Sequence, residues 1–446
     1  MPEAGPRIVI VGGGFAGLYA ATHLARSELI HRDARITLVD RKNYFTFTPL
    51  LAEVAAGTLL REHVTNPYRV LARQYGFDFV RDEVSGLDLK EKTVIGGQGS
   101  YPFDYLVLAA GAAPTYFGNA DIEERALPFT TVDDAVVIRN RVIDSFERAL
   151  HAPTDEERTL ETTFVIAGAG PAGVELASEI RHLSQGRLPQ YFQGAPPARV
   201  VLADPGNRIL RAWDAELAEA GRDRLCSYGV DVRLNTHIVA ASEDSVTLDG
   251  PEGREDIPTK TLVWTAGTMP ASWVGSLGLP TERGALEVNE FLQVKGHPHI
   301  FAVGDVSMLM DVRAEMPFPR VAPIAISQGV RAAGNIEGLV FGRPLEAYHA
   351  HHAGKIVSLG GGMALVDILG ARLSGWLAWW IYRGAYLLKL VGMKNKVRVL
   401  LTLALNRVFD PDIASRVERC LDASDVNLED GRGREPEPPA EQTDPR

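Results

Sequence analysis

The stretch from Arg7 to Asp40 reads RIVIVGGGFAGLYAATHLARSELIHRDARITLVD and decides the fold of the first part of the chain. Its first five residues are a short β-branched run, which is typical of a buried strand. Gly12, Gly14 and Gly17 follow, then a helical pattern, and a second strand ends in Asp40. The glycines allow a tight turn, a close approach to a pyrophosphate and helix–strand packing, and the acid is placed for ribose hydroxyls. The stretch therefore predicts a βαβ dinucleotide-binding unit with the pyrophosphate at a helix N-terminus.

The same pattern occurs a second time further along the chain. A strand at Thr163–Ala167 leads into the loop GAGPAG, and a second strand ends in Asp204. The helix between them starts at Pro171, a position where the missing backbone N–H of proline breaks no helical hydrogen bond. A single glycine loop is weak support, but two full strand–loop–helix–strand–acid units predict two bound dinucleotides. Asp204 favours NADH because a carboxylate repels the 2′-phosphate of NADPH, although Arg208 softens that preference.

A third segment indicates how the two units are arranged. His299–Asp305 reads HIFAVGD and precedes a helical stretch that starts at Ala322. Together with the N-terminal loop, it resembles the second FAD motif of flavoproteins with two dinucleotide-binding domains, which implies that Asp305 binds the ribityl chain. Asp104–Gly111 and Lys260–Gly267 look like the strands that lead into the crossings between the domains. We therefore expect a discontinuous FAD domain with an inserted NADH domain, an arrangement that can bring nicotinamide and flavin into contact.

Composition and cysteine content exclude several kinds of partner. The chain has 446 residues and a net charge of −11, so a general affinity for nucleic acid is not expected. Cys226 and Cys420 lie far apart, which argues against a disulfide scaffold and against thiol–disulfide chemistry. The histidines within Tyr348–His352 have no acid or thiol companions at metal spacing, so we expect no metal site. The start of the chain has no secretion-signal pattern, and we expect a cytoplasmic protein.

Two longer segments carry a more specific resemblance. Leu38–Thr58 contains PLLAEVAAG, and Asp104–Ala135 contains a Tyr-Phe-Gly turn. With the later GPAGVELASEI they resemble the type II NADH dehydrogenases, the single-subunit, non-pumping NADH:quinone oxidoreductases, from Arg7 to Phe409. The family's Ala-Gln-x-Ala-x-Gln-Gln motif is only partly present, because Ala322–Gln328 reads APIAISQ. The resemblance implies FAD in the first domain, NADH in the second and a quinone reached from the membrane side.

The glycine loops and the resemblance together give the expected site residues. Glu175 matches a family glutamate that lies near the nicotinamide and is linked to electron or proton delivery, although an acid near a helix N-terminus can also simply favour the helix dipole. Gln328 is the second expected catalytic residue, on the flavin and quinone side. FAD is expected to bind through Gly12, Gly14, Phe15, Ala16, Gly17, Asp40, Arg41, Pro49, Val84, Ala110, Gly111, Gly304, Asp305 and Ala325. NADH is expected to bind through Gly168, Gly170, Pro171, Ala172, Gly173, Glu175, Asp204 and Gly267.

The C-terminal part of the chain holds two amphipathic segments. Gly375–Val391 reads GWLAWWIYRGAYLLKLV, and a helix over Leu373–Val391 places Trp380 and Leu388 on one face. The two charges within the run argue against a membrane span, which needs about 20 predominantly apolar residues. Val397–Val408 forms a second apolar stripe beyond a basic connection. The pair predicts an interfacial anchor on anionic lipid, with a dimer interface or ordinary core helices as the alternative.

These observations predict an α/β fold of two Rossmann-like domains followed by a C-terminal anchor. We expect an FAD-binding domain over residues 1–120 and 291–345, an NADH-binding domain over 121–290, a membrane-associating or dimerising region over 346–420 and a disordered acidic tail over 421–446. The expected activity is FAD-dependent transfer of hydride from NADH and then of two electrons to a membrane quinone. Reduction of a soluble acceptor and a nucleotide-gated redox sensor are the alternatives. We expect a homodimer, peripheral on the cytoplasmic face of the membrane.

Overall fold

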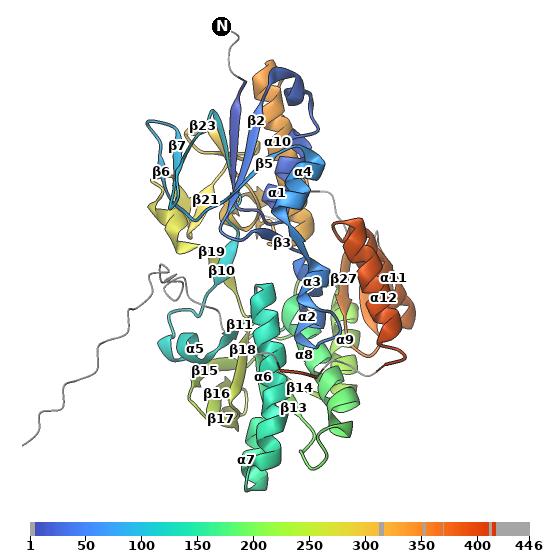
Figure 1. The fold of residues 1–446 in the computed structure, drawn as a ribbon. Helices are drawn as coiled ribbons and strands as arrows, with labels where there is room; N and C mark the ends of the chain where they lie inside the picture. The colour runs from blue at the N-terminus through green and yellow to red at the C-terminus, as the bar shows by residue number, and fades with distance from the viewer. Residues whose placement is uncertain (1–4, 312–315, 351–353, 369, 410–412, 416–446) are drawn as a thin grey trace, which may run out of the picture.

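Two mainly parallel sheets organise the chain, one above the other in Figure 1. The structure is a computed structural model that describes residues 5–311, 316–350, 354–368, 370–409 and 413–415. The first sheet has, in spatial order, strands β22 (Gln293–Val294), β23 (His297–Ala302), β9 (Tyr105–Leu108), β1 (Arg7–Val11), β2 (Arg35–Asp40) and β5 (Asp78–Arg81). The β-branched run of β1 lies between β2 and β9, and its side chains from Ile8 onward are buried on both faces.

The second sheet is parallel throughout. Its strands, in spatial order, are β11 (Leu127–Pro128), β18 (Thr261–Trp264), β12 (Thr163–Ala167), β13 (Arg199–Asp204) and β14 (Val230–Leu234). The helices that follow or precede these strands are α6 (Val132–His151), α8 (Pro171–His182) and α9 (Ala215–Ser227). β12 is wholly buried and β1 is buried from Ile8 onward, which explains why both strands contain continuous apolar runs in the sequence.

The chain leaves the first sheet after β9 and returns to it at β22, so the second sheet is built from the chain between them. Where the chain crosses, β10 (Ala112–Pro114) pairs antiparallel with β19 (Thr268–Pro270). Helices α1 (Phe15–Leu24) and α10 (Ala322–Phe341), far apart in sequence, pack against each other beside the first sheet (Figure 1). The contact is close, because a Cβ on Gly329 would lie 2.2 Å from the carbonyl oxygen of Ala16.

Smaller elements connect and flank the two sheets. The antiparallel pair of β3 and β4 and the helices α2 and α3 lie between the sheets, beside the C-terminal helices (Figure 1). The smaller elements are α2 (Leu51–Ala55), α3 (Arg61–Val64), α4 (Tyr68–Tyr75), α5 (Ala120–Arg125), α7 (Asp155–Glu161), β3 (Tyr44–Thr46), β4 (Thr65–Pro67), β6 (Val84–Asp88), β7 (Thr93–Gly96), β8 (Ser100–Pro102), β15 (His237–Ala241), β16 (Ser245–Gly250), β17 (Gly253–Pro258), β20 (Thr281–Glu282), β21 (Ala285–Glu287), β24 (Ser307–Met308), β25 (Met310–Asp311) and β26 (Met316–Pro317).

The C-terminal part forms an antiparallel sheet followed by two helices. The sheet contains β27 (Lys355–Ser358), β28 (Ala364–Ile368) and β29 (Ala371–Gly375), and the helices are α11 (Trp376–Lys389) and α12 (Met393–Leu405). The prediction of a helix from Leu373 was therefore wrong at its start. Leu373 and Ser374 pair with β28, and the chain turns into α11 only after Gly375, whose φ of 98° suits glycine.

Candidate functional site

The first glycine loop is a tight turn with open space on one side. Gly12 has a φ of 97°, and a Cβ on Gly17 would lie 1.8 Å from the carbonyl oxygen of Gly12. A Cβ on Gly14, in contrast, would meet no atom within 4 Å. Asp40 closes the loop by accepting hydrogen bonds from the backbone N–H of Gly13 at 2.6 Å and of Lys42 at 2.7 Å. The loop therefore presents open space at the N-terminus of α1, where a phosphate is favoured.

The second glycine loop repeats this construction. Gly168 has a φ of 98°, a Cβ on Gly173 would lie 1.8 Å from the Gly168 carbonyl oxygen, and a Cβ on Gly170 would meet nothing within 4 Å. The carboxylate of Asp204 accepts from the Ala169 N–H at 2.8 Å, much as Asp40 does in the first loop. Both acids thus brace their own loops, a role that the sequence pattern did not reveal.

Asp204 also has a charged neighbour. One carboxylate oxygen accepts from the Gly206 N–H at 2.7 Å and lies 3.4 Å from a guanidinium nitrogen of Arg211. Arg208 donates to the carbonyl oxygen of Arg211 at 2.8 Å, so it contacts the backbone of the arginine that pairs with this acid. Asp204 is buried, whereas the Arg211 side chain is mostly exposed. The negative charge expected to select NADH is therefore partly offset at the place where the ribose is expected.

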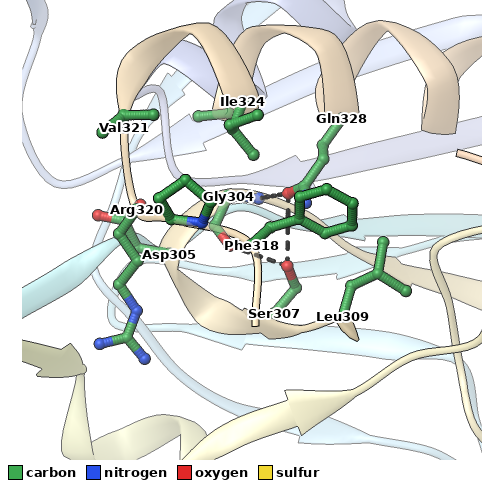
Figure 2. Close-up of a pocket in the computed structure, with 11 residues that line it drawn as sticks. Gly304, Asp305, Ser307, Leu309, Phe318, Arg320, Val321, Ile324 and Gln328 are labelled. Carbon is green, nitrogen blue, oxygen red and sulfur yellow. Dashed lines mark hydrogen bonds between the residues drawn. The ribbon is translucent and has the colours of Figure 1, made fainter. Parts of the chain in front are cut away.

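Gln328 stabilises the turn that carries Asp305 (Figure 2). Its side-chain oxygen accepts from the Gly304 N–H at 2.7 Å and from the Ser307 hydroxyl at 3.4 Å. Gly304 has a φ of 72°, so the turn suits glycine. Burial raises the pKa of Asp305, and Arg320 opposes that shift. This turn lines a small recess together with Leu309, Phe318, Pro319, Val321, Ile324 and Ala325.

The two positions that depart from the glutamine motif have structural roles. Pro323 lies in the first turn of α10, where the missing backbone donor costs nothing. Ser327 lies one turn on, and its hydroxyl lies 2.8 Å from the hydroxyl of Tyr348 and donates to the Ile324 carbonyl oxygen at 3.0 Å. The side chain of Ser327 is therefore used within the protein, and Gln328 alone carries the amide of this motif.

Glu175 is buried and does not act as a helix-dipole partner. It lies beyond the first turn of α8, which contains no acid. Its carboxyl accepts from the Ser358 N–H of β27 at 3.0 Å. Burial raises the pKa of Glu175 to about 8, and the nearby carboxylates of Glu53 and Glu179 act in the same direction, against Arg383. Glu175 is therefore expected to hold a proton at neutral pH.

Three charged residues near Glu175 were not predicted from the sequence as site residues. Glu53 belongs to the PLLAEVAAG segment, Glu179 to GPAGVELASEI and Arg383 to the C-terminal amphipathic segment. Each lay in a quoted stretch, but an apolar or helical pattern gives no sign that charged residues from three distant segments meet. A charged residue inside an otherwise apolar stretch was the one available signal, as for Glu53 and Arg383.

The remaining predicted residues occupy positions around the same regions. Phe15 at the start of α1 makes edge-on ring contacts with Phe45 and Phe47, just before Pro49. A Cβ on Gly267 would lie 2.9 Å from the ring of Phe117. Val84 instead begins β6 in a separate three-stranded sheet, and Arg41 is exposed. Ala16 lies in α1, Ala110 and Gly111 follow β9, and Pro171 and Ala172 open α8.

Metal ligation has no support within the described part of the chain. No group of three or more histidine, cysteine, aspartate or glutamate side chains among those residues could hold a metal ion. In the predicted connector, Tyr348 is buried and His349 is exposed, whereas His351 and His352 lie outside the described residues. The predicted tail over 421–446 also lies outside them.

The C-terminal helices turn their polar sides toward the protein. Asn395 of α12 donates to the Thr65 carbonyl oxygen at 2.8 Å, and Asn406, directly after α12, donates to the Thr58 carbonyl oxygen at 2.9 Å. Their outer sides are apolar and exposed, with Trp376 at 67% of its possible exposure. The other exposed apolar side chains here are Leu377, Trp380, Leu388, Met393, Val397, Leu400, Leu401, Leu405, Val408 and Phe409. We call this set the outer apolar face. None of the described helices is both long enough and apolar enough to cross a bilayer.

Comparison with known proteins decides the family. The pattern that defines the pyridine nucleotide-disulphide oxidoreductases matches residues 6–329. The type II NADH:quinone oxidoreductase NdhA of Mycobacterium tuberculosis is 34% identical over 416 residues, which cover 88% of this chain and 85% of that protein. The chain belongs to the type II NADH:quinone oxidoreductases.

Other members of the type II NADH:quinone oxidoreductases match over most of their length. The protein of that name from Staphylococcus aureus is 27% identical over 375 residues, which cover 84% of this chain and 92% of the relative. An NDH2 from Plasmodium falciparum, solved in complex with NADH, shares the fold with a TM-score of 0.84 at 17% identity, covering 92% of this chain and all of the other. As a type II NADH:quinone oxidoreductase, the chain is an NADH dehydrogenase whose cofactors are FAD and NADH.

The residues present fit two dinucleotides. Gly14 and Gly170 each leave open space in front of a helix N-terminus. At the third glycine of each loop, in contrast, the carbonyl oxygen of the first glycine occupies the space that a Cβ would need. A side chain at either open position would occupy the approach of a pyrophosphate to the backbone. The type II NADH:quinone oxidoreductase fold thus has two glycine loops of the same shape, each with space for a pyrophosphate.

Proposed function

We propose that this enzyme passes electrons from NADH to a membrane quinone without pumping protons. The observation that supports this acceptor best is the placement of α11. Its inner side contributes Tyr382 and Arg383 to the buried cluster around Glu175, and its outer side exposes Trp376 and Trp380. An apolar quinone dissolved in lipid can reach a site next to such a helix without entering water.

Each predicted cofactor site has a loop to hold it. The loop around Gly14, with the Gly304–Asp305 turn and Gln328 behind it, would hold FAD. The loop around Gly170 would hold NADH, with Asp204 at the ribose. When bound, FAD would supply the redox chemistry, namely hydride acceptance from NADH and delivery of two electrons. The chain itself orients the two cofactors and controls protons.

Glu175 is the residue that would hold a proton for the acceptor. Reduction of a quinone by NADH consumes one proton besides the hydride, because NADH, one proton and quinone give NAD⁺ and quinol. A carboxyl with a pKa of about 8 is protonated at neutral pH and can release that proton near working pH. Gln328 has a positioning role, because its amide oxygen is occupied by the Gly304 turn.

The outer apolar face would lie on the lipid surface. Large exposed apolar patches on a protein mark interaction surfaces. Lys389, Lys394 and Arg398 are exposed on or between the same helices and can attract anionic headgroups. This arrangement favours peripheral attachment, for which we propose the cytoplasmic face. The expected homodimer stays a prediction.

The acceptor is tested by reoxidation of the flavin. We expect anaerobic protein reduced with NADH to be reoxidised by a short-chain quinone within the time of a turnover, and by a quinone embedded in vesicles when the protein is bound to them. A flavin that NADH reduces but no quinone reoxidises would contradict the proposal. Fast reoxidation by soluble acceptors alone would support the soluble-acceptor alternative, and slow turnover with every acceptor would support a redox sensor.

Attachment to lipid is expected to depend on the outer apolar face. In a Leu401→Glu, Leu405→Glu variant, each substitution removes about 1.5–3 kcal/mol of apolar transfer, so the fraction bound to anionic vesicles should fall at least about tenfold. Co-sedimentation with vesicles measures this. Val137→Glu is the matched control, since Val137 is an exposed apolar residue on α6. Equal binding by the two variants would show that lipid does not contact this face.

Nucleotide choice is expected to depend on Asp204. An Asp204→Ala variant loses the hydrogen bonds from the N–H groups of Ala169 and Gly206 and leaves Arg211 without its opposing charge. At about 1 kcal/mol for each bond, kcat/KM for NADH should fall roughly 30-fold, while the value for NADPH falls less. Asp231→Ala, on the neighbouring strand and also paired with arginines, is the control. Unchanged NADH kinetics would show that the second loop does not bind NADH.

A further inference from the structure

Phe117 combines a strained backbone with an exposed apolar side chain. Its φ of 53° lies in the left-handed region, which a bulky side chain rarely adopts. Its side chain is 73% exposed. Leu210 and Leu292 are also bulky apolar residues with a positive φ, but both are buried, and that burial offsets the strain of their backbones. Burial does not offset the strain at Phe117.

Hydrogen bonds on both sides of Phe117 hold its backbone in this conformation. The Phe117 N–H donates to the hydroxyl of Thr115 at 3.3 Å, and the carbonyl oxygen of Thr115 accepts from the indole N–H of Trp264 at 2.9 Å. After the turn, the side-chain amide of Asn119 donates to the Val239 carbonyl oxygen at 2.9 Å. Trp264 belongs to β18 and Val239 to β15, so the turn is fixed from outside itself. Backbone strain that the surroundings fix in this way is concentrated at ligand-binding sites.

The ring of Phe117 lies against Gly267, next to the second glycine loop. A Cβ on Gly267 would lie 2.9 Å from Cζ of Phe117, so a side chain at that position would displace the ring. Gly267 directly follows Ala266, and a Cβ on Gly168 of the second loop would lie 2.8 Å from Cα of Ala266. The exposed ring is therefore adjacent to the loop that is expected to hold NADH.

The order of the strands identifies the half of NADH that lies near this ring. In the second sheet, β12 leads into the glycine loop and lies between β13 and β18. Asp204 ends β13 and marks the side on which the adenosine ribose is expected. A dinucleotide that crosses the loop extends to the other side, beyond the end of β18, where residues 265–267 follow. Phe117 thus lies on the nicotinamide side.

The flavin side of the chain reaches the same place. Arg320 donates to the carbonyl oxygen of Thr268, the residue after Gly267, at 2.6 Å. Arg320 also lines the recess at Asp305 (Figure 2), where the flavin half of FAD is expected. Since the nicotinamide has to meet the flavin, this location agrees with the one that the strand order gives.

We propose that Phe117 is a substrate-contacting residue whose ring packs on the nicotinamide half of NADH, shields it from water and orients it toward the first domain. The inference rests on the proposed placement of NADH in the second loop, and it does not depend on the electron acceptor. A planar nicotinamide has flat faces on which a phenyl ring packs well. Bound NADH would bury the ring, and this burial would offset the backbone strain.

Two ligands that differ in the nicotinamide test this contact. We expect Phe117→Ala holoenzyme to bind NAD⁺ about 5- to 30-fold more weakly than the parent, because the contact between the rings is lost. ADP-ribose has the adenosine, the pyrophosphate and the second ribose but no nicotinamide, so it should bind both proteins equally. Phe117→Tyr keeps the ring and should restore the affinity for NAD⁺. Isothermal titration calorimetry measures both ligands without turnover.

A Phe117→Gly variant separates the contact from the shape of the turn. Glycine adopts the left-handed region without strain, so the thermal unfolding midpoint should lie about 2 °C above that of Phe117→Ala. NAD⁺ should nevertheless bind as weakly to Phe117→Gly as to Phe117→Ala. When each holoenzyme is mixed rapidly with NADH and no quinone, the NADH concentration that gives half the limiting rate of flavin reduction should rise by the same factor. Phe409→Ala removes a ring that is 65% exposed elsewhere and should leave these measurements unchanged.

The outcomes separate this inference from the proposed function. Unchanged NAD⁺ affinity in Phe117→Ala would overturn the contact. An equal loss of affinity for NAD⁺ and ADP-ribose would also overturn it, because the substitution would then act by deforming the loop. Intact NAD⁺ binding in a Gly173→Ala variant would overturn the placement of NADH in the second loop. Failure of quinone to reoxidise the flavin, with the predicted binding results intact, would overturn the acceptor and leave the role of Phe117 standing.

Discussion

A Gly17→Ala variant is expected to be purified without its flavin. The added Cβ would lie 1.8 Å from the carbonyl oxygen of Gly12, a distance that forces the loop or α1 to move. Overpacking of this kind costs about 3 kcal/mol, and it acts where the loop must hold its shape for a pyrophosphate. The ratio of flavin to protein absorbance and the thermal unfolding midpoint measure the effect.

The matching substitution in the second loop separates the two sites. In Gly173→Ala, a Cβ would lie 1.8 Å from the Gly168 carbonyl oxygen, so the same distortion is expected in the NADH cradle. That variant should keep its flavin and lose reduction by NADH. Gly334→Ala in α10 is the control, because a Cβ there meets no atom within 4 Å. Loss of flavin from Gly173→Ala but not from Gly17→Ala would reverse the assignment of the two loops.

A Glu175→Gln variant is expected to become more stable than the parent as pH rises. The pKa of Glu175 is raised from 4.5 to about 8, mainly by burial. Below about pH 4.5 the carboxyl is neutral in both the folded and the unfolded chain, and the stability it contributes is fully present. Between 4.5 and 8 only the carboxyl of the unfolded chain ionises, so the free energy of unfolding of the parent falls by up to about 5 kcal/mol. Above pH 8 the folded chain ionises as well and the loss ends. Glutamine does not ionise and escapes this loss.

Unfolding in denaturant at about pH 5, 6.5 and 8 checks the prediction. The difference in the free energy of unfolding between Glu175→Gln and the parent should grow with each step. Glu161→Gln is a control of opposite sign: burial raises the pKa of Glu161, but hydrogen bonds from Lys260 and Arg148 outweigh burial and lower it. That variant should lose stability at neutral pH. A pH-independent difference for Glu175→Gln would falsify the protonated state of this residue.

The elements built from local patterns were predictable from the sequence. The strand at Thr163–Ala167, the start of α8 at Pro171 and the start of α10 at Ala322 all lie where the sequence places them. These are short apolar runs, helix-starting prolines and glycine turns, whose conformations depend on neighbouring residues. The prediction of a helix at Leu373 failed because pairing with β28, a contact formed in the tertiary structure, selects the strand.

The C-terminal helices show the limit of periodicity. The spacing of Trp380 and Leu388 indicated an apolar stripe, but a helix alone does not say which side faces the protein. The structure turns that stripe outward, because Tyr382 and Arg383 find partners in Glu53 and the polar side of α12 bonds to the α3 region. An inward stripe would have favoured the reading of ordinary core helices.

The sequence by itself determined that this protein is an α/β enzyme with two nucleotide loops, because glycines, short strands and terminal acids act over a few neighbouring residues. Only the tertiary structure decided that Asp40 and Asp204 brace their loops and that Glu175 shares a buried cluster with Glu53 and Arg383. The physical reason is that the protonation of a carboxyl depends on its burial and on the charges around it. Those charges come from segments that lie far apart in the chain and meet only in the fold.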